Sequence, residues 1–167
     1  MNEPVDPRRF RDVLGHFPTG VTVVTGMDAD GVPHGITIGS FVSVSLDPPL
    51  VGFLPGRSSR SWPAIAQSSA FCVNILGAGQ EELCWRFAKE PATGDDTKFA
   101  GVEWTKSPSG SPILPGVIGW IDCTVETVSE AGDHWFVMGR VVDLFHGHEV
   151  TDAMVFFRGK VTSIART

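Results

Sequence analysis

Hydrophobic and polar positions along the chain predict a few short helices among a larger number of strands. The pair Asp6-Pro7 is typical of a helix start, because aspartate caps the first turn and proline is tolerated at the first helical position. Apolar side chains then recur at helical spacing until Pro18 ends the segment. We expect this helix to bury one face, formed by Phe10, Val13, Leu14 and Phe17.

Two further helices are expected in the first half of the chain. The first covers 58–68, where Ser58 or Ser59 can cap the helix and Ile65 faces inward with Trp62. The second covers 80–89 and has an amphipathic pattern, which predicts that Leu83, Trp85 and Phe87 are buried.

Runs rich in β-branched and apolar residues predict the strands, at 20–27, 34–45, 50–54, 70–76, 116–129, 134–145 and 154–165. The segment from Glu90 to Pro112 is rich in glycine and proline and is expected to be a loop. Strands outnumber helices and no regular alternation of strand and helix is present, which favours an antiparallel barrel over a parallel sheet. The fold class is therefore expected to be mainly β (α+β), in one domain spanning 1–167.

Composition narrows the classes of partner. The chain has 13 basic and 19 acidic residues and a net charge of −6, which argues against nucleic acid and against an anionic membrane surface. The N-terminus has no apolar leader-like region, and no apolar run is long enough to span a membrane. We expect a soluble, cytoplasmic protein that binds a small molecule.

Several common active-site motifs are absent from the sequence. The three cysteines have no paired spacing, and His146-Gly147-His148 offers two ligands in one turn without further support, so no metal site is predicted. The GAGQEE string at 77–82 lacks the third glycine of a dinucleotide fingerprint. The GK[ST] of a Walker loop, the GxSxG elbow and HExxH do not occur either.

Residue types suited to ligand binding are instead concentrated in the stretch from Asp30 to Trp62. It combines glycines, serine and threonine hydroxyls and two arginines, Arg57 and Arg60. Such a mixture suits a polar ligand held mainly by backbone, with phosphate at the start of the helix near Ser58–Ser61. The same composition also fits two ordinary strands joined by turns. Outside this stretch, Asp133-His134 is either an oriented functional histidine or a structural one.

Read as a string, this stretch resembles a known family. The order dGxxxGxTxxSFxSVSLDPPLV follows FPTGVTVVT and precedes FCVNIL, and further matches reach RFA at 86–88, GDH at 132–134 and GRV at 139–141. This order resembles the short-chain flavin reductases, which feed reduced flavin to two-component monooxygenases. The strings SRSW at 59–62 and VFFRG at 155–159 are similar to the reductases that serve hydroxylases of phenolic or steroid-derived rings.

The resemblance implies a split, Greek-key-like antiparallel barrel with a few peripheral helices. It also implies a homodimer, which a content of 16 aromatic residues without tyrosine favours too. For the flavin, FMN or FAD, it implies contacts from Thr37, Ile38, Gly39, Ser40, Ser43, Val44, Ser45, Leu54, Pro55, Arg57, Ser58, Arg60, Ser61, Trp62, Arg86 and Phe87. For the nicotinamide of NADH or NADPH it implies His134, with Phe157 and Arg158.

The activity implied is NAD(P)H:flavin oxidoreduction, in which a hydride passes to the flavin and reduced flavin leaves for a separate oxygenase. Gly39 stands where many relatives have asparagine, so it cannot supply that side-chain amide to the flavin, although its backbone contact is still expected. Leu54 stands where several relatives have cysteine. Two alternatives use the same barrel: a non-catalytic flavin-binding or storage protein, and an oxidase of amine or pyridoxine type, which the SVSLDPP string disfavours.

Overall fold

The computed structural model describes residues 4–90, 98–147 and 152–164. The helices are α1 (Pro7–Leu14), α2 (Ser61–Ile65), which continues into the 3-10 helix η1 (Ala66–Ser68), and α3 (Glu81–Ala88). The strands are β1 (Thr19–Gly20), β2 (Thr22–Met27), β3 (Pro33–Ile38), β4 (Val42–Leu46), β5 (Pro49–Phe53), β6 (Ala70–Ile75), β7 (Thr105–Lys106), β8 (Pro112–Ile113), β9 (Gly119–Ala131), β10 (His134–His146), β11 (Ala153–Phe157) and β12 (Lys160–Ile164).

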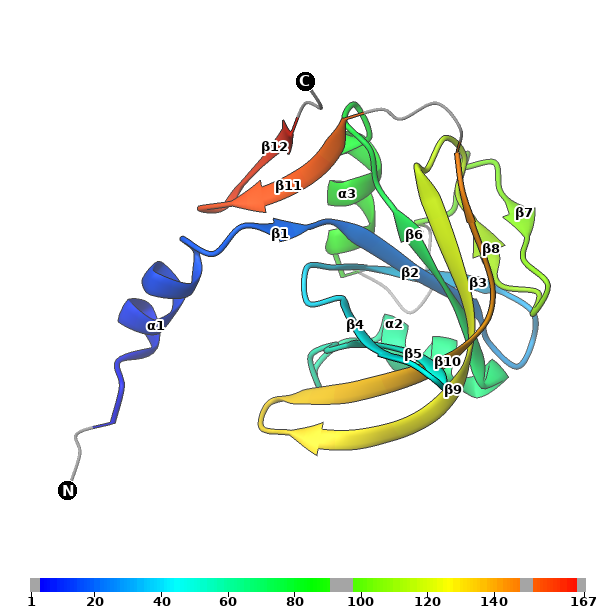
Figure 1. Ribbon diagram of the computed structural model, residues 1–167, viewed down its shortest axis with the longest axis horizontal. Helices are drawn as coiled ribbons and strands as arrows, with labels where there is room; N and C mark the ends of the chain where they lie inside the picture. The colour runs from blue at the N-terminus through cyan, green and yellow to red at the C-terminus, as the bar shows by residue number, and fades with distance from the viewer. Residues whose placement is uncertain (1–3, 91–97, 148–151, 165–167) are drawn as a thin grey trace.

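A seven-stranded antiparallel sheet forms the body of the molecule, in the order β3-β2-β6-β9-β10-β5-β4 (Figure 1). The two edge strands of this sheet, β3 and β4, are consecutive in the chain and are joined only by residues 39–41. Four residue steps span at most roughly 14 Å. The sheet must therefore curl until its edges nearly meet, which makes a barrel with one open seam.

Two clusters of buried side chains hold the barrel together. The first lies inside the barrel, where Phe53 packs edge-on against Trp62 of α2 and against Phe71 of β6. The second lies under α3, where Phe87 packs edge-on against Phe99. Strand β2 contributes to both clusters, because Val24 belongs to the first and Val23 to the second. This strand is buried on both faces, as its run of apolar residues predicts.

A smaller sheet, β1-β11-β12, connects the body to the N-terminal arm. Helix α1 stands apart from the body of the molecule (Figure 1). The predicted cap is confirmed, since Asp6 accepts a hydrogen bond from the Arg8 amide at 2.9 Å and Pro7 opens the helix. The predicted burial is wrong, because no residue of α1 is buried.

The structure corrects other element boundaries. The strand expected over 34–45 is two strands at opposite edges of the sheet, and the last expected strand is the hairpin of β11 and β12, turned at Arg158 and Gly159 with φ of 49° and 76°. The helix expected over 58–68 begins at Ser61. Trp85, expected to be buried, is 38% exposed. Residues 91–97 of the expected loop and Ala165 lie outside the described residues.

Within the described ranges, no helix combines the length and the apolar character that a membrane crossing requires. The same ranges hold no group of three or more histidine, cysteine or acidic side chains that could bind a metal ion. His148, of the His146-Gly147-His148 string, lies outside them. All three cysteines of the chain are free and buried.

Candidate functional site

A cleft of about 460 Å³ lies at the seam of the barrel. It is lined by residues 36–40, which end β3 and start the short connection, by Leu54 and Gly56 after β5, and by His134 at the start of β10. The sheet order explains this meeting, because β5 lies beside β10 and the 39–41 connection carries one edge of the sheet to the other. The structure thus brings Thr37, Ile38, Gly39, Ser40, Leu54 and His134 of the predicted site together around one cleft.

The hydroxyl groups at this cleft are engaged with the protein itself. Thr37 Oγ1 donates to the carbonyl of Cys84 in α3 at 2.7 Å. Ser40 Oγ donates to the Leu54 carbonyl at 3.3 Å and accepts from the Leu54 amide at 3.0 Å. The Ser40 bonds join the 39–41 connection to the segment after β5, and the Thr37 bond joins β3 to α3. They leave main-chain groups as the principal means of binding a polar ligand here.

His134 is oriented by its neighbour in the sequence. Its Nδ1 lies 2.7 Å from Asp133 Oδ1, and this hydrogen bond holds the pKa of the Asp133 carboxyl below its usual range. With Nδ1 engaged, Nε2 is the nitrogen on the side of Gly56, where a Cβ built on that glycine would lie 3.9 Å away. A methyl group at position 56 would therefore be in van der Waals contact with this nitrogen.

Four predicted residues that follow β5, namely Pro55, Arg57, Ser58 and Arg60, are held in different ways. Arg57 lies 4.7 Å over the Trp135 ring and 3.5 Å from Glu130, and its amide donates to the Asp133 carbonyl. Ser58 and Arg60 are exposed, and the Arg60 amide donates to Glu90. Pro55 is buried, and its carbonyl accepts from the Trp135 amide.

Three side chains predicted to contact flavin lie in the interior. Ser61 is 1% exposed and accepts a hydrogen bond from Lys98, while Trp62 is 4% exposed in the first core cluster. Phe87 is fully buried in the second cluster. Their helices turn these side chains toward the core, so direct contacts of Ser61, Trp62 and Phe87 with flavin stay a prediction.

Arg86 is held by two partners outside the cleft. It donates to the Ala100 carbonyl and to Glu82 Oε1, each at 2.8 Å. Ser43, Val44 and Ser45 lie on the edge strand β4, where Ser43 and Val44 are exposed. These residues are near the seam by topology, but they are not part of the described lining of the cleft.

Phe157 and Arg158, predicted beside the nicotinamide, lie at the β11–β12 turn, away from that lining. Phe157 contacts the His16 ring edge-on, and the Arg158 amide donates to the Gly15 carbonyl. The neighbouring Phe156 instead lines an apolar hollow of about 250 Å³ with Val21, Cys84 and Trp85. This hollow shares Thr37 and Gly39 with the cleft. Sequence reasoning did not select Phe156, because only strand pairing decides which of two adjacent phenylalanines faces this hollow.

Comparison with known proteins agrees with this geometry. The model of the flavin reductase like domain matches residues 14–165. The chain belongs to this family. The reductase subunit HsaB of a flavin-dependent monooxygenase from Rhodococcus jostii is 51% identical over 162 residues, which cover 97% of this chain and 80% of that protein.

Solved structures of similar proteins share the fold of this flavin reductase-like chain. Nitrilotriacetate monooxygenase component B from Mycobacterium thermoresistibile superimposes with a TM-score of 0.86 at 45% identity, covering 95% of this chain and 86% of that one. The NADH:FAD oxidoreductase SgcE6 from Streptomyces globisporus, in complex with NAD and FAD fragments, gives 0.85 at 34% identity and covers 98% of each chain. The mainly β, split-barrel fold expected from the sequence is confirmed.

Proposed function

We propose that this protein is an NAD(P)H-dependent flavin reductase that supplies reduced FMN or FAD to a separate monooxygenase. The observation that carries the proposal is the cleft at the seam, where the backbone of 37–40 faces an oriented histidine. Family membership and relatives that are reductase subunits support it. The resemblance in sequence extends the proposal to an oxygenase that acts on phenolic or steroid-derived rings. A cytoplasmic location is also part of the proposal.

Main-chain groups of residues 37–40, Leu54 and Gly56 hold the flavin in this proposal. They fit a broad, flat ligand because, apart from His134, the cleft is lined by glycines, by braced hydroxyls and by the aliphatic residues Ile36, Ile38 and Leu54. Arg57, Ser58 and Arg60 are exposed beside this wall and provide charge and a hydroxyl for the flavin phosphate. The side chains of Ser61, Trp62 and Phe87 are buried and are not needed to hold the flavin in this proposal.

His134 acts on the nicotinamide side. When the Nδ1 proton is donated to Asp133, Nε2 presents a lone pair toward the cleft. The carboxamide of nicotinamide has an NH₂ group that can donate to this lone pair. Hydride transfer is the chemistry that the two bound nucleotides supply, and the protein contributes orientation and exclusion of water.

The decisive experiment follows the loss of NADH absorbance with and without added FMN or FAD. A reductase oxidises NADH only when flavin is present, and it does so catalytically. Binding of flavin without NADH or NADPH oxidation would replace the proposal with the storage barrel. A protein that binds no flavin would refute both the reductase and the storage barrel.

A further inference from the structure

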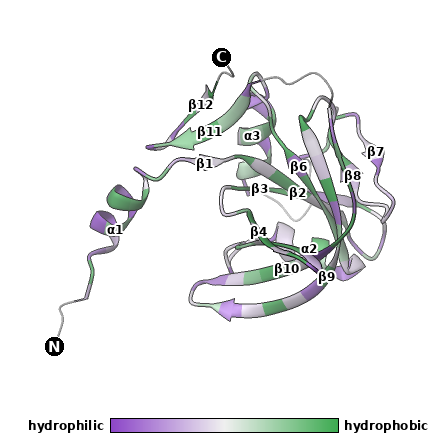
Figure 2. Ribbon diagram, viewed as in Figure 1, coloured by the Kyte–Doolittle hydropathy of each residue, from purple (hydrophilic) through white to green (hydrophobic). Residues whose placement is uncertain are grey.

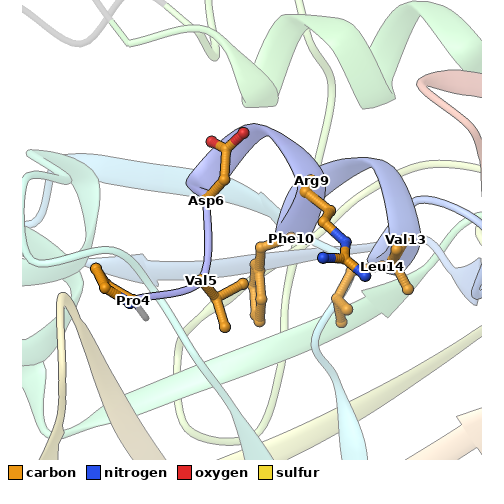
Figure 3. A pocket seen from close by; sticks show the side chains of 7 residues that line it. All are labelled: Pro4, Val5, Asp6, Arg9, Phe10, Val13 and Leu14. Carbon is orange, nitrogen blue, oxygen red and sulfur yellow. The ribbon is translucent and has the colours of Figure 1, made fainter. Parts of the chain in front are cut away.

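Phe156 lines an apolar hollow that three separate elements enclose. This Phe156 hollow has a volume of about 250 Å³ and is lined by residues of β3, α3 and β11. By contrast, the hollow of about 480 Å³ under α1 is lined by the N-terminal arm alone, from Pro4 to Leu14 (Figure 3). The Phe156 hollow can therefore surround part of a ligand on several sides.

The pairing of β1 with β11 turns Phe156 toward the cleft. Phe156 lies directly opposite Thr19 in this pairing, so their side chains are on the same face of the small sheet. This face is directed toward Gly39, because a Cβ atom at position 39 would lie 3.0 Å from Thr19 Oγ1. Phe157 is on the other face and contacts the segment that leads into β1. The hollow and the cleft share Thr37 and Gly39, so a single ligand can extend from one into the other.

The polar side-chain groups around the Phe156 hollow are already engaged within the protein. Thr37 Oγ1 donates to the Cys84 carbonyl at 2.7 Å, and the Trp85 indole Nε1 donates to Glu81 Oε1 at 3.0 Å. Burial raises the pKa of the Cys84 thiol, so this group stays uncharged. None of the described lining residues carries a charge, and β11 is hydrophobic along its length (Figure 2). A group that fills this hollow finds few hydrogen-bonding partners, which favours methyl and benzene groups.

The flavin ring has an edge of this kind. Isoalloxazine carries a benzene ring with two methyl groups at one edge, and carbonyl oxygens and ring nitrogens at the opposite edge. Adenine and nicotinamide carry amino, amide or ring nitrogen atoms that would lose their hydrogen bonds to water in an apolar hollow. The cleft offers main-chain groups and His134 instead, so it suits the polar edge of the flavin ring.

On the basis of the proposed function, we propose that the Phe156 hollow takes the methyl-bearing edge of the flavin ring. Trp85 and Phe156 are 38% and 37% exposed, so each keeps apolar surface that the ring can cover. The polar edge of the ring stays in the cleft, beside the main chain of residues 37–40. Phe156, Trp85 and Ala88 then determine which flavins bind tightly, according to the substituents on the benzene ring.

The first test compares two flavins that differ only in these methyl groups. Binding of FMN and of 7,8-didemethyl-FMN to the full chain is measured by titration calorimetry without NADH. Burial of both methyl groups predicts that wild type binds FMN about tenfold more tightly. Phe156→Ala opens the hollow, and the ratio should fall to about threefold or less. The matched control Phe157→Ala changes the next side chain, on the other face of β11, and should keep the wild-type ratio.

Equal affinity of wild type for the two flavins would overturn the proposal. A Phe156→Ala variant that keeps the wild-type ratio would overturn it as well, because the methyl groups would then lie elsewhere.

The second test fills the hollow instead of opening it. Ala88 is exposed at the end of α3, so Ala88→Leu adds a side chain to the hollow without disturbing the core. We expect FMN binding to weaken about tenfold or more, and 7,8-didemethyl-FMN binding to weaken less, since that flavin lacks the methyl groups that meet the new side chain. Lys89→Leu, at the next exposed position, is the control and should bind both flavins as wild type does. Unchanged binding in Ala88→Leu would refute the proposal.

Flavin-dependent NADH oxidation, measured with FMN on the same samples, reports separately on the proposed reductase. Oxidation by a wild type that does not distinguish the two flavins would refute the ring placement alone. A protein that binds neither flavin would refute the proposed function together with this placement.

Discussion

Lys98 places an ammonium group inside the molecule, where only 6% of the residue is exposed. Its Nζ donates to the Gly35 carbonyl at 3.1 Å, to Ser61 Oγ at 2.9 Å and to the Phe87 carbonyl at 3.4 Å. These acceptors belong to β3, α2 and α3. A buried cation is stable only with such partners. Lys98 therefore fixes both helices to the strand that leads into the cleft.

Replacement of Lys98 by methionine keeps the apolar stem but leaves three acceptors without this donor. We expect a loss of about 1–3 kcal/mol in the free energy of unfolding, the usual cost of unsatisfied buried polar groups. Urea denaturation measures the change. Lys106→Met, at an exposed position of β7, is the control and should unfold as wild type does. Equal midpoints for the two variants would show that the Lys98 contacts contribute nothing to stability.

His134→Ala tests the proposed contact with the nicotinamide. At saturating flavin, we expect kcat/KM for NADH or NADPH to fall about tenfold, which corresponds to about 1.4 kcal/mol of lost transition-state stabilisation. Flavin affinity should not change, because main-chain groups of 37–40, Leu54 and Gly56 hold the flavin in this proposal and the imidazole of His134 does not. His146→Ala, at the other end of the same strand, is the matched control. A fall in flavin affinity in place of kcat/KM would move His134 to the flavin side.

At the scale of elements, strand β10 crosses the core at Gly139. A Cβ at this position would overlap the ring of Phe71 and lie 3.0 Å from Cys123 Cβ. The register of β9 and β10 also shifts between Met138 and Gly139, so the strand bends where it passes these side chains. The glycine allows β6, β9 and β10 to pack at this spacing.

Gly139→Ala should destabilise the fold by about 1–3 kcal/mol, since a well-packed core must move to accept a methyl group. Thermal unfolding followed by circular dichroism measures this loss. Gly20→Ala is the control, because nothing lies within 4 Å of a Cβ built there. If both variants melt together, the core at Gly139 is looser than the contacts indicate.

Local patterns predicted most of the strands but not how they are separated or covered. The periodicity of residues 34–45 continues across Gly39 and Ser40, so sequence alone did not reveal that the two halves lie at opposite edges of the sheet. For the same reason, the apolar face of α1 was expected to be buried, although its cover depends on a surface outside the helix.

The predicted site shows the same limit. The motif strings located residues 37–40, Leu54 and His134, which do line one cleft. They did not show that Thr37 donates to Cys84, 47 positions away in the chain, or that Ser61 and Phe87 turn inward. Side-chain direction is set by tertiary neighbours, so a motif identifies the segment of a site more reliably than the atoms that face the ligand.

At the scale of the whole molecule, folding buries all three thiols and changes their pKa values. Burial, reinforced by the charge of Asp122, raises the pKa of Cys72 well above its usual range and that of Cys123 to about 12. Burial also raises the pKa of Cys84. In the folded protein these thiols therefore stay protonated and unreactive where an exposed cysteine would ionise.

This raised pKa predicts a loss of stability at alkaline pH. Below the unfolded thiol pKa of about 8.5 both states are protonated and the stabilisation is complete. Above it the unfolded state ionises and the folded state does not, so the free energy of unfolding falls as pH rises. We expect the melting temperature of Cys72→Ala with Cys123→Ala to decline less steeply with pH than that of wild type. Parallel declines would assign the alkaline loss to other groups.

The short link from Gly39 to Phe41 has a further consequence for how ligands come and go. Because it ties the two sheet edges covalently, the link limits how far these edges can separate at this end of the seam. A gap limited in this way needs little reshaping to accept a ligand, so we expect little conformational entropy to be lost when it is filled. Such a gap suits the proposed reductase, whose reduced flavin must leave after every turnover.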